Sequence, residues 1–223
     1  EVHDNTQILA KYPDALSTTA SPPWGPKNAY HFWGEPLFGY YRSDDPWILR
    51  RHAELLSDAG VDFLVFDATN AAIYQDVILK LLQVFEEQRQ LGERVPQVAF
   101  MVNSQAGETA DRILQTFYKP SQHPENAQAE LWFRWQGKPL LLCDPAEAST
   151  EVAEFFTLRK AHWPFELVNT HNAWNWEATY PQVYSYDTDP SKPEEVNVSV
   201  AQNLRQSDGR VEMMSTGNAR GRS

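Results

Sequence analysis

The chain has 223 residues, of which 42% are hydrophobic and 22% charged, which is typical of one globular domain with a sizeable core. A formal net charge of -11, with no stripe of Lys and Arg, disfavours binding to nucleic acid, and no apolar run reaches the roughly 18 to 20 residues of a membrane span. The single cysteine, Cys143, excludes an internal disulfide and sits in an apolar run, where a small buried hydrophobe is expected.

The first 45 residues carry no strong periodicity and are rich in Pro, Gly and aromatic residues. We predict a long loop over residues 1–45, and a loop of that length inside a compact domain usually has a function. Its aromatic side chains, among them Trp33 and Tyr40, suit the flat apolar faces of sugar rings. The alternative is that these rings pack on one another.

Helices and strands alternate after this loop. Asp45 is a good N-cap, Pro46 suits the first helical position and Gly60 ends the first helix. Apolar residues at helical spacing predict three more helices, near residues 72–91, 109–117 and 150–160.

Short apolar runs predict the strands between these helices. The four core strands are expected at residues 63–66, 98–102, 140–143 and 165–168. A short strand at 131–135 precedes the third core strand through a tight turn at Gln136-Gly137. Two weaker strands are expected at 183–186 and 196–200.

Each core strand ends abruptly in a polar residue: Asp67, Asn103 and Asp144 follow the first three, and Asn169 and His171 follow the fourth. Continuous apolar runs joined by helices indicate parallel strands, whose carboxyl ends share one face that carries the chemistry. These side chains should therefore converge, as in an active site.

The fold class that this pattern predicts is α/β, of the (β/α)8 TIM-barrel type. Four firm strands and two or three weak ones fall short of the eight of a closed barrel. We therefore expect residues 1–223 to form a single, incomplete barrel catalytic domain, cut from a longer protein, although an open sheet is the alternative.

Three segments resemble bacterial proteins grouped with glycoside hydrolase families 71 and 99, namely residues 31–41, 58–70 and 132–139. The resemblance covers most of the chain. It implies a (β/α)8 barrel that cleaves α-linked glucans or mannose-containing glycans. In the better-understood relatives the catalytic glutamates sit on later strands, so this chain is expected to hold substrate-binding residues and part of the catalytic set.

Glycoside hydrolysis commonly uses two carboxyl groups across the scissile bond, one of which stays protonated near neutral pH. Asp67, Asp144 and Glu177 are the catalytic candidates. Glu177 directly follows Trp176 in the loop after the fourth core strand, and the nearby rings of Trp174 and Trp176 could raise its pKa. Each has a structural alternative: Asp67 could cap a helix or bind loop amides, Asp144-Pro145 could open a turn, and Glu177 could be an exposed loop residue.

The candidate substrate-binding residues share a position in the loops or at the strand ends. They are His31, Trp33, Tyr40, Asn103, His171, Trp174 and Trp176. The histidines are scattered, and no pair has the spacing of a zinc site on a helix, so we expect no metal and no cofactor.

We therefore predict a secreted or periplasmic bacterial glycosidase whose partner is a poly- or oligosaccharide. One alternative is a carbohydrate-binding barrel without catalysis. Another is a metal-dependent glycosyltransferase that uses Asp187 and Asp189, although that pair more simply forms a turn. The chain has no Gly-rich phosphate loop after a strand and no Gly-x-Ser-x-Gly elbow, which disfavours nucleotide and serine-hydrolase chemistry.

Overall fold

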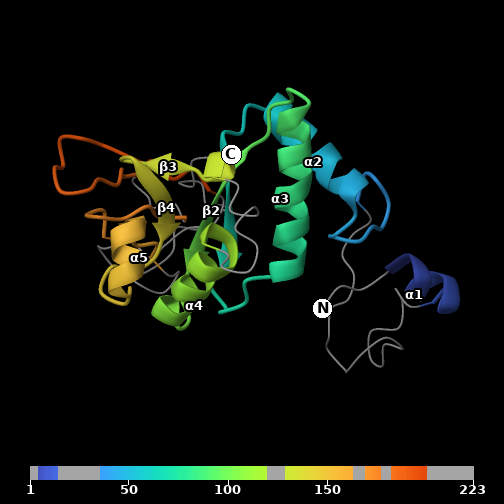
Figure 1. The fold of residues 1–223 in the computed structure, drawn as a ribbon, viewed down its shortest axis with the longest axis horizontal. Coiled ribbons are helices and arrows are strands. Elements are labelled where there is room, and N and C mark those ends of the chain that lie inside the picture. Colours follow the sequence, from blue (N-terminus) through green and yellow to red (C-terminus); the bar gives the residue numbers. More distant parts are fainter. Residues whose placement is uncertain (1–4, 15–35, 120–128, 163–168, 177–181, 200–223) are drawn as a thin grey trace, which may run out of the picture. The chain divides into compact units, whose positions relative to one another are not determined.

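The computed structural model describes residues 5–14, 36–119, 129–162, 169–176 and 182–199 (Figure 1). The chain is a mixed α/β protein with a mostly parallel sheet. It divides into two compact units, one made of residues 1–61 and 75–95 and the other of residues 62–74 and 96–223. The strand predicted at 165–168 lies outside the described residues.

The first unit contains the helices α1 (Asn5–Lys11), α2 (Pro46–Asp58) and α3 (Gln75–Gln90). The start of α2 is confirmed, because the Asp45 side chain accepts a hydrogen bond from the Trp47 amide at 2.9 Å. Gly60 has a φ of +81°, a conformation that favours glycine, and the helix ends before it. The prediction of a loop throughout residues 1–45 is wrong at α1, which is too short to show a clear periodicity.

Helices α2 and α3 run in the same direction. The Arg50 guanidinium binds the Glu87 carboxylate at 2.8 Å, and the Ser57 hydroxyl donates to the Arg94 carbonyl at 2.9 Å. The two partners of each pair are 37 residues apart in the chain, so the two segments are aligned in the same direction. Helix α3 also joins the first two parallel strands of the second unit, as a crossover helix does.

The second unit is built on four parallel strands that are neighbours in chain order. They are β1 (Phe63–Ala68), β2 (Gln97–Val102), β4 (Lys138–Leu142) and β5 (Thr157–Arg159). Strand β3 (Arg134–Trp135) pairs antiparallel with the start of β4. Gln136 and Gly137 both have positive φ values, 52° and 87°, as a two-residue hairpin turn requires, which confirms the predicted turn.

The two faces of this sheet are covered differently. One face packs against α4 (Ala106–Ile113), the π-helical turn η2 (Leu114–Tyr118) and α5 (Thr150–Phe155), with Phe100 stacked on Phe117 at 5.2 Å (Figure 1). We call the other face the tryptophan face, because Trp174 is part of a buried cluster there and Trp135 and Trp176 pack against it. That cluster comprises Ala99, Met101, Leu140, Leu142 and Trp174.

The helix predicted over residues 150–160 is too long. Helix α5 ends at Phe155, and the next four residues, 156–159, are all buried, with β5 starting at Thr157. Burial of successive residues is what a parallel strand covered on both faces requires. Beyond Trp174, in the described residues 182–199, the weaker predicted strands are reduced to isolated bridges, His171 with Tyr186 and Ser185 with Glu195. In the described ranges, no helix has both the length and the apolar character needed to cross a membrane.

Candidate functional site

The polar residues predicted at the strand ends lie along one edge of the sheet. Asp67 is the last but one residue of β1, Asn103 directly follows β2, and Asp144 follows β4 by two residues. The register pairs Asp67 with Met101 and Met101 with Leu142, so the three strands end at a similar level. We call this edge, with Asp67, Asn103, Asp144 and Lys160, the carboxyl edge.

Asp67 is exposed at this edge. Its pleat position is that of Phe63, which packs against the cluster of the tryptophan face, so the side chain lies on that side of the sheet. One carboxylate oxygen, Oδ1, accepts a hydrogen bond from the Thr69 amide at 2.9 Å. Asp67 thus binds a loop amide, which is the structural role that the sequence offers as an alternative to catalysis. Because the residue is exposed, its carboxyl group is still accessible. Asn103, at the end of the next strand, is also exposed.

Asp144 is more firmly held. Its Oδ1 accepts the Ala146 amide at 2.9 Å, and its Oδ2 lies 3.0 Å from the Lys160 ammonium. Burial alone would raise the pKa of Asp144, but the Ala146 amide and Lys160 outweigh it and hold the pKa below its usual value. Asp144 is therefore a stable carboxylate near neutral pH. The sequence does not indicate Lys160, because this residue follows β5, which lies in the range where the sequence predicts a helix.

The loops at the carboxyl edge are tied to one another. The Ser104 amide, after β2, donates to the Thr69 carbonyl, after β1, at 2.8 Å. The Arg112 guanidinium of α4 donates to the Ala71 carbonyl at 3.0 Å. Gly107 of α4 approaches the loop after β4 so closely that a Cβ atom there would lie 2.2 Å from the Glu147 carbonyl oxygen. These contacts fix the strand-end loops as one rigid rim.

Backbone strain is concentrated in the same loops. Ala71, Tyr74 and Gln105 have φ values of 62°, 47° and 50°, in the left-handed region that residues other than glycine rarely occupy. Each such residue costs on the order of 1–3 kcal/mol and persists only where its surroundings hold it, most often at functional sites. Three of them following β1 and β2 make this rim the strongest candidate site in the sheet unit.

The tryptophan face carries a second polar cluster, centred on Glu194. Its carboxylate, 8% exposed, accepts five hydrogen bonds, two from Arg159 and one each from Trp135, Gln136 and Trp174. Burial alone would raise the pKa of Glu194, but these donors lower it to about 2. All its acceptor positions are used, so the carboxylate joins the 182–199 segment to the sheet and has no capacity left for a ligand.

Trp174 belongs to this cluster. Only 7% of the residue is exposed, and its ring lies 4.9 Å from that of Trp135. The sequence places it among the sugar-contacting loop residues, but in the structure its ring is occupied by core packing and its indole N–H by Glu194. Trp176 is half-buried and donates its indole N–H to the His162 carbonyl at 2.9 Å.

A third group surrounds Glu195. The Asn175 amide donates to its carboxyl group at 3.3 Å, and the Asn175 side chain donates to the Ser185 hydroxyl at 3.2 Å. Burial raises the pKa of Glu195 to about 7, against a partial lowering by Asn175 and Ser185. This carboxyl group can hold a proton near neutral pH, a property that no pattern in the sequence indicates.

The remaining predicted residues are dispersed. His31, Trp33 and Glu177 lie outside the described residues. Tyr40 is half-buried in the first unit, and His171 is exposed with its ring 5.9 Å from that of Tyr186.

The two aspartates of the glycosyltransferase alternative each already have a partner. Asp187 pairs with Arg159 at 3.4 Å, and Asp189 accepts two hydrogen bonds from Ser191. Within the ranges that the structure describes, no three His, Cys, Asp or Glu residues are grouped so that they could hold a metal ion.

Comparisons with known proteins identify no relative of this chain. No protein-family model, no curated protein and no solved structure matches the chain.

Proposed function

We propose that the chain forms part of a (β/α)8-barrel glycoside hydrolase, similar to families 71 and 99, with its site at the carboxyl edge. The observation that supports this best is the position of Asp67, Asn103 and Asp144 at neighbouring strand ends of one parallel sheet. The parallel strands also follow in chain order, as in a barrel, whereas a doubly wound sheet reverses its order. The strained, interlocked rim adds the rigidity that a catalytic site needs.

In this proposal Asp144, kept ionised by Lys160, is the base, and the acid is Asp67 or Glu177. Strand β2 separates β1 from β4, so the backbones at Asp67 and Asp144 are about 10 Å or more apart. This spacing suits an inverting enzyme, whose carboxyl groups are about 6.5–9.5 Å apart, better than a retaining one at about 5–5.5 Å. A carboxylate base that activates water across the sugar ring matches that arrangement.

The test is the release of reducing ends from α-glucans and α-mannans by the wild-type protein and by Asp67→Asn and Asp144→Asn. Loss of a catalytic carboxyl group should lower turnover about 10²–10⁴-fold, with the unfolding midpoint little changed. Asp76→Asn, an exposed aspartate in the first turn of α3, is the matched control and should keep full activity. Wild-type turnover in Asp67→Asn at wild-type stability would contradict the assignment of Asp67.

A carbohydrate-binding protein without catalysis is a second candidate. It is favoured by the commitment of both aspartates to their own loop amides and of Asp144 to Lys160. Calorimetry decides between the two: a sugar that binds with measurable heat but releases no reducing ends identifies the binding protein.

A further inference from the structure

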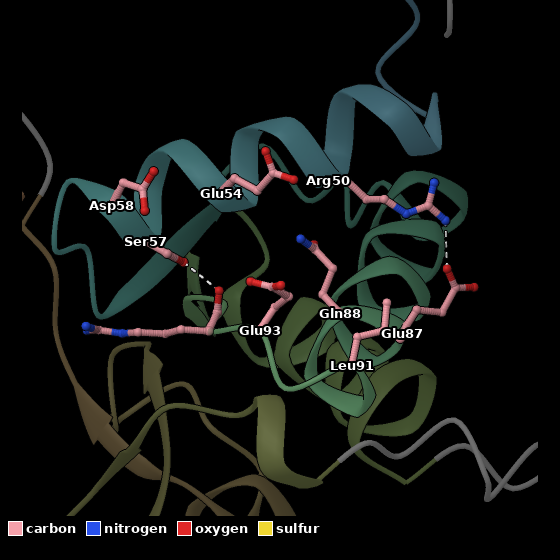
Figure 2. Close-up of a pocket in the computed structure, with 9 residues that line it drawn as sticks. Arg50, Glu54, Ser57, Asp58, Glu87, Gln88, Leu91 and Glu93 are labelled. Carbon is pink, nitrogen blue, oxygen red and sulfur yellow. Dashed lines mark hydrogen bonds and ion pairs between the residues drawn. The ribbon is translucent and has the colours of Figure 1, made fainter.

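The first unit contains a groove of about 670 Å³ between α2, the end of α3 and the residues that follow α3 (Figure 2). Its volume is in the range of small-molecule sites. Residues 50–58 form one wall, which extends about 12 Å along α2 at the rise of an α-helix, so the groove is elongated. None of the predicted site residues lines it.

One buried polar side chain in this groove has an acceptor without a donor. Gln88 is only 5% exposed, and its Oε1 has no hydrogen-bond partner within the described residues. Figure 2 shows the side chain extending from α3 toward α2, into the space bounded by Glu54 and Glu93. Native proteins rarely leave a buried acceptor unpaired, because its lost hydration is not replaced. An N–H group bound in the groove would supply the missing donor.

The charges of the groove select a cation. The lining holds four carboxylates, those of Glu54, Asp58, Glu87 and Glu93, and two guanidinium groups. Because Arg51 also pairs with Glu54 at 2.7 Å, one negative charge is left in excess. The Asp58 and Glu93 carboxylates form no ion pair within the described part of the chain. The carboxyl-terminal ends of α2 and α3, which carry partial negative charge, lie beside the same groove.

The shape of the groove and the apolar side chain of Leu91 favour an organic cation. Glu54 and Asp58 are one helical turn apart, about 6 Å along the axis, a spacing that successive ammonium groups of an alkyl chain can match. Leu91, 81% exposed, offers contact for methylene groups between the charges. No three side chains of the described residues are grouped to hold a metal ion, so a bare divalent cation fits less well.

We propose that this groove binds a linear aliphatic polyamine, with its ammonium groups on Asp58, Glu54 and Glu93 and one N–H donated to Gln88. The site is independent of the carboxyl edge and of the sugar chemistry proposed there.

The test is isothermal titration calorimetry of the whole chain with spermidine at low ionic strength. Saturable binding at one site is expected, weakened at least tenfold in Asp58→Asn/Glu93→Gln, whose two positions are exposed, so the variant should fold normally. Glu108→Gln/Glu154→Gln removes two exposed carboxylates from the sheet unit and is the matched control, expected to bind like the wild type.

Gln88→Met tests the buried acceptor without changing the charge. It should bind spermidine several-fold more weakly and unfold at a higher temperature in the absence of ligand, because no unpaired oxygen is left inside. The proposal is overturned if no saturable binding occurs, if both double variants weaken binding equally, or if Mg²⁺ at the same concentration displaces spermidine. Tighter binding of a lysine-rich peptide than of spermidine would assign the groove to a protein partner and overturn it as well.

Discussion

The tryptophan face and the carboxyl edge of the same sheet both carry carboxyl groups, but these groups differ in burial and in the number of hydrogen bonds they accept. Glu194 on the tryptophan face is buried and accepts five hydrogen bonds, whereas Asp67 at the carboxyl edge is exposed and accepts the Thr69 amide. The first arrangement stabilises the fold and leaves nothing for a ligand. The second leaves a carboxyl group accessible on a rigid support, which is what a binding or catalytic site requires.

The largest test of this comparison is Glu194→Ala. Removing the carboxylate takes from the buried Arg159 guanidinium, 4% exposed, its two shortest ion-pair contacts and leaves it only the longer pair with Asp187 at 3.4 Å, and two indole N–H groups lose their acceptor. We expect the free energy of unfolding to fall by about 3–5 kcal/mol in urea titrations. Asp67→Asn, as the counterpart at the carboxyl edge, should change it by less than about 1 kcal/mol. Equal losses in the two variants would contradict the division of roles.

Gly107→Ala tests whether the rim of the carboxyl edge is as tightly packed as the core. Within a helix this change usually stabilises by about 0.5–1 kcal/mol, because glycine is the more flexible residue in the unfolded chain. Here the added Cβ atom would lie 2.2 Å from the Glu147 carbonyl oxygen, a backbone atom that can move only with its loop. We expect a loss of about 1–3 kcal/mol in thermal or urea unfolding. A gain in stability would show that the loop after β4 yields readily.

Glu195 and Glu194 are adjacent, yet their effects on the pH dependence of stability have opposite signs. The pKa of Glu195 is raised to about 7, so its contribution is fully present below the unfolded value near 4.5 and is lost as pH rises to about 7. The pKa of Glu194 is lowered to about 2, so its contribution is present above 4.5 and is lost as pH falls toward 2.

Glu195→Gln removes the first of these effects. The variant should keep its stability between pH 4.5 and 7, where the wild type loses about 1–3 kcal/mol, as measured by urea titration at several pH values. Glu154→Gln, at an exposed position of α5, is the control and should follow the wild-type curve. A Glu195→Gln curve parallel to that of the wild type would contradict the raised pKa.

Patterns local to a few residues were enough to predict much of this fold. Asp45, Pro46 and Gly60 mark the ends of α2, and Gln136-Gly137 marks a hairpin turn, because each of these signals depends on backbone preferences of single residues. The apolar runs of β1, β2 and β4 also predicted that Asp67, Asn103 and Asp144 would share an edge, which follows from parallel pairing alone.

Features that depend on partners distant in the sequence could not be predicted. Strand β5 has only three residues and directly follows a helix, so its sequence merges with the helical pattern until pairing with β4 defines it. The Arg159–Glu194 pair spans 35 residues and the Asp144–Lys160 pair 16, and neither has a spacing that a local rule recognises. The burial of Trp174 could not be predicted for the same reason, since a loop tryptophan and a core tryptophan look identical in the sequence.

Lys160→Met is the smallest and most specific test of the carboxyl edge. The Lys160–Asp144 pair is partly exposed, with 35% and 26% of the two side chains accessible, so its loss should lower stability by about 1 kcal/mol or less. The pKa of Asp144, measured by carboxyl NMR titration, should rise, because one of the groups that stabilises its charge is gone. In Lys160→Arg the pKa of Asp144 should again lie below its usual value.

Lys119→Met provides the matched control for this change. Lys119 forms an ion pair of the same length, 3.0 Å, with Glu151 in the first turn of α5. It should affect the pKa of Glu151 and leave that of Asp144 unchanged. If Lys160→Met also left the pKa of Asp144 unchanged, the amide of Ala146 alone would account for the lowered pKa. Asp144 would then be a turn residue like Asp189. A clear rise would instead make Lys160 the residue that keeps Asp144 charged and ready to act as a base.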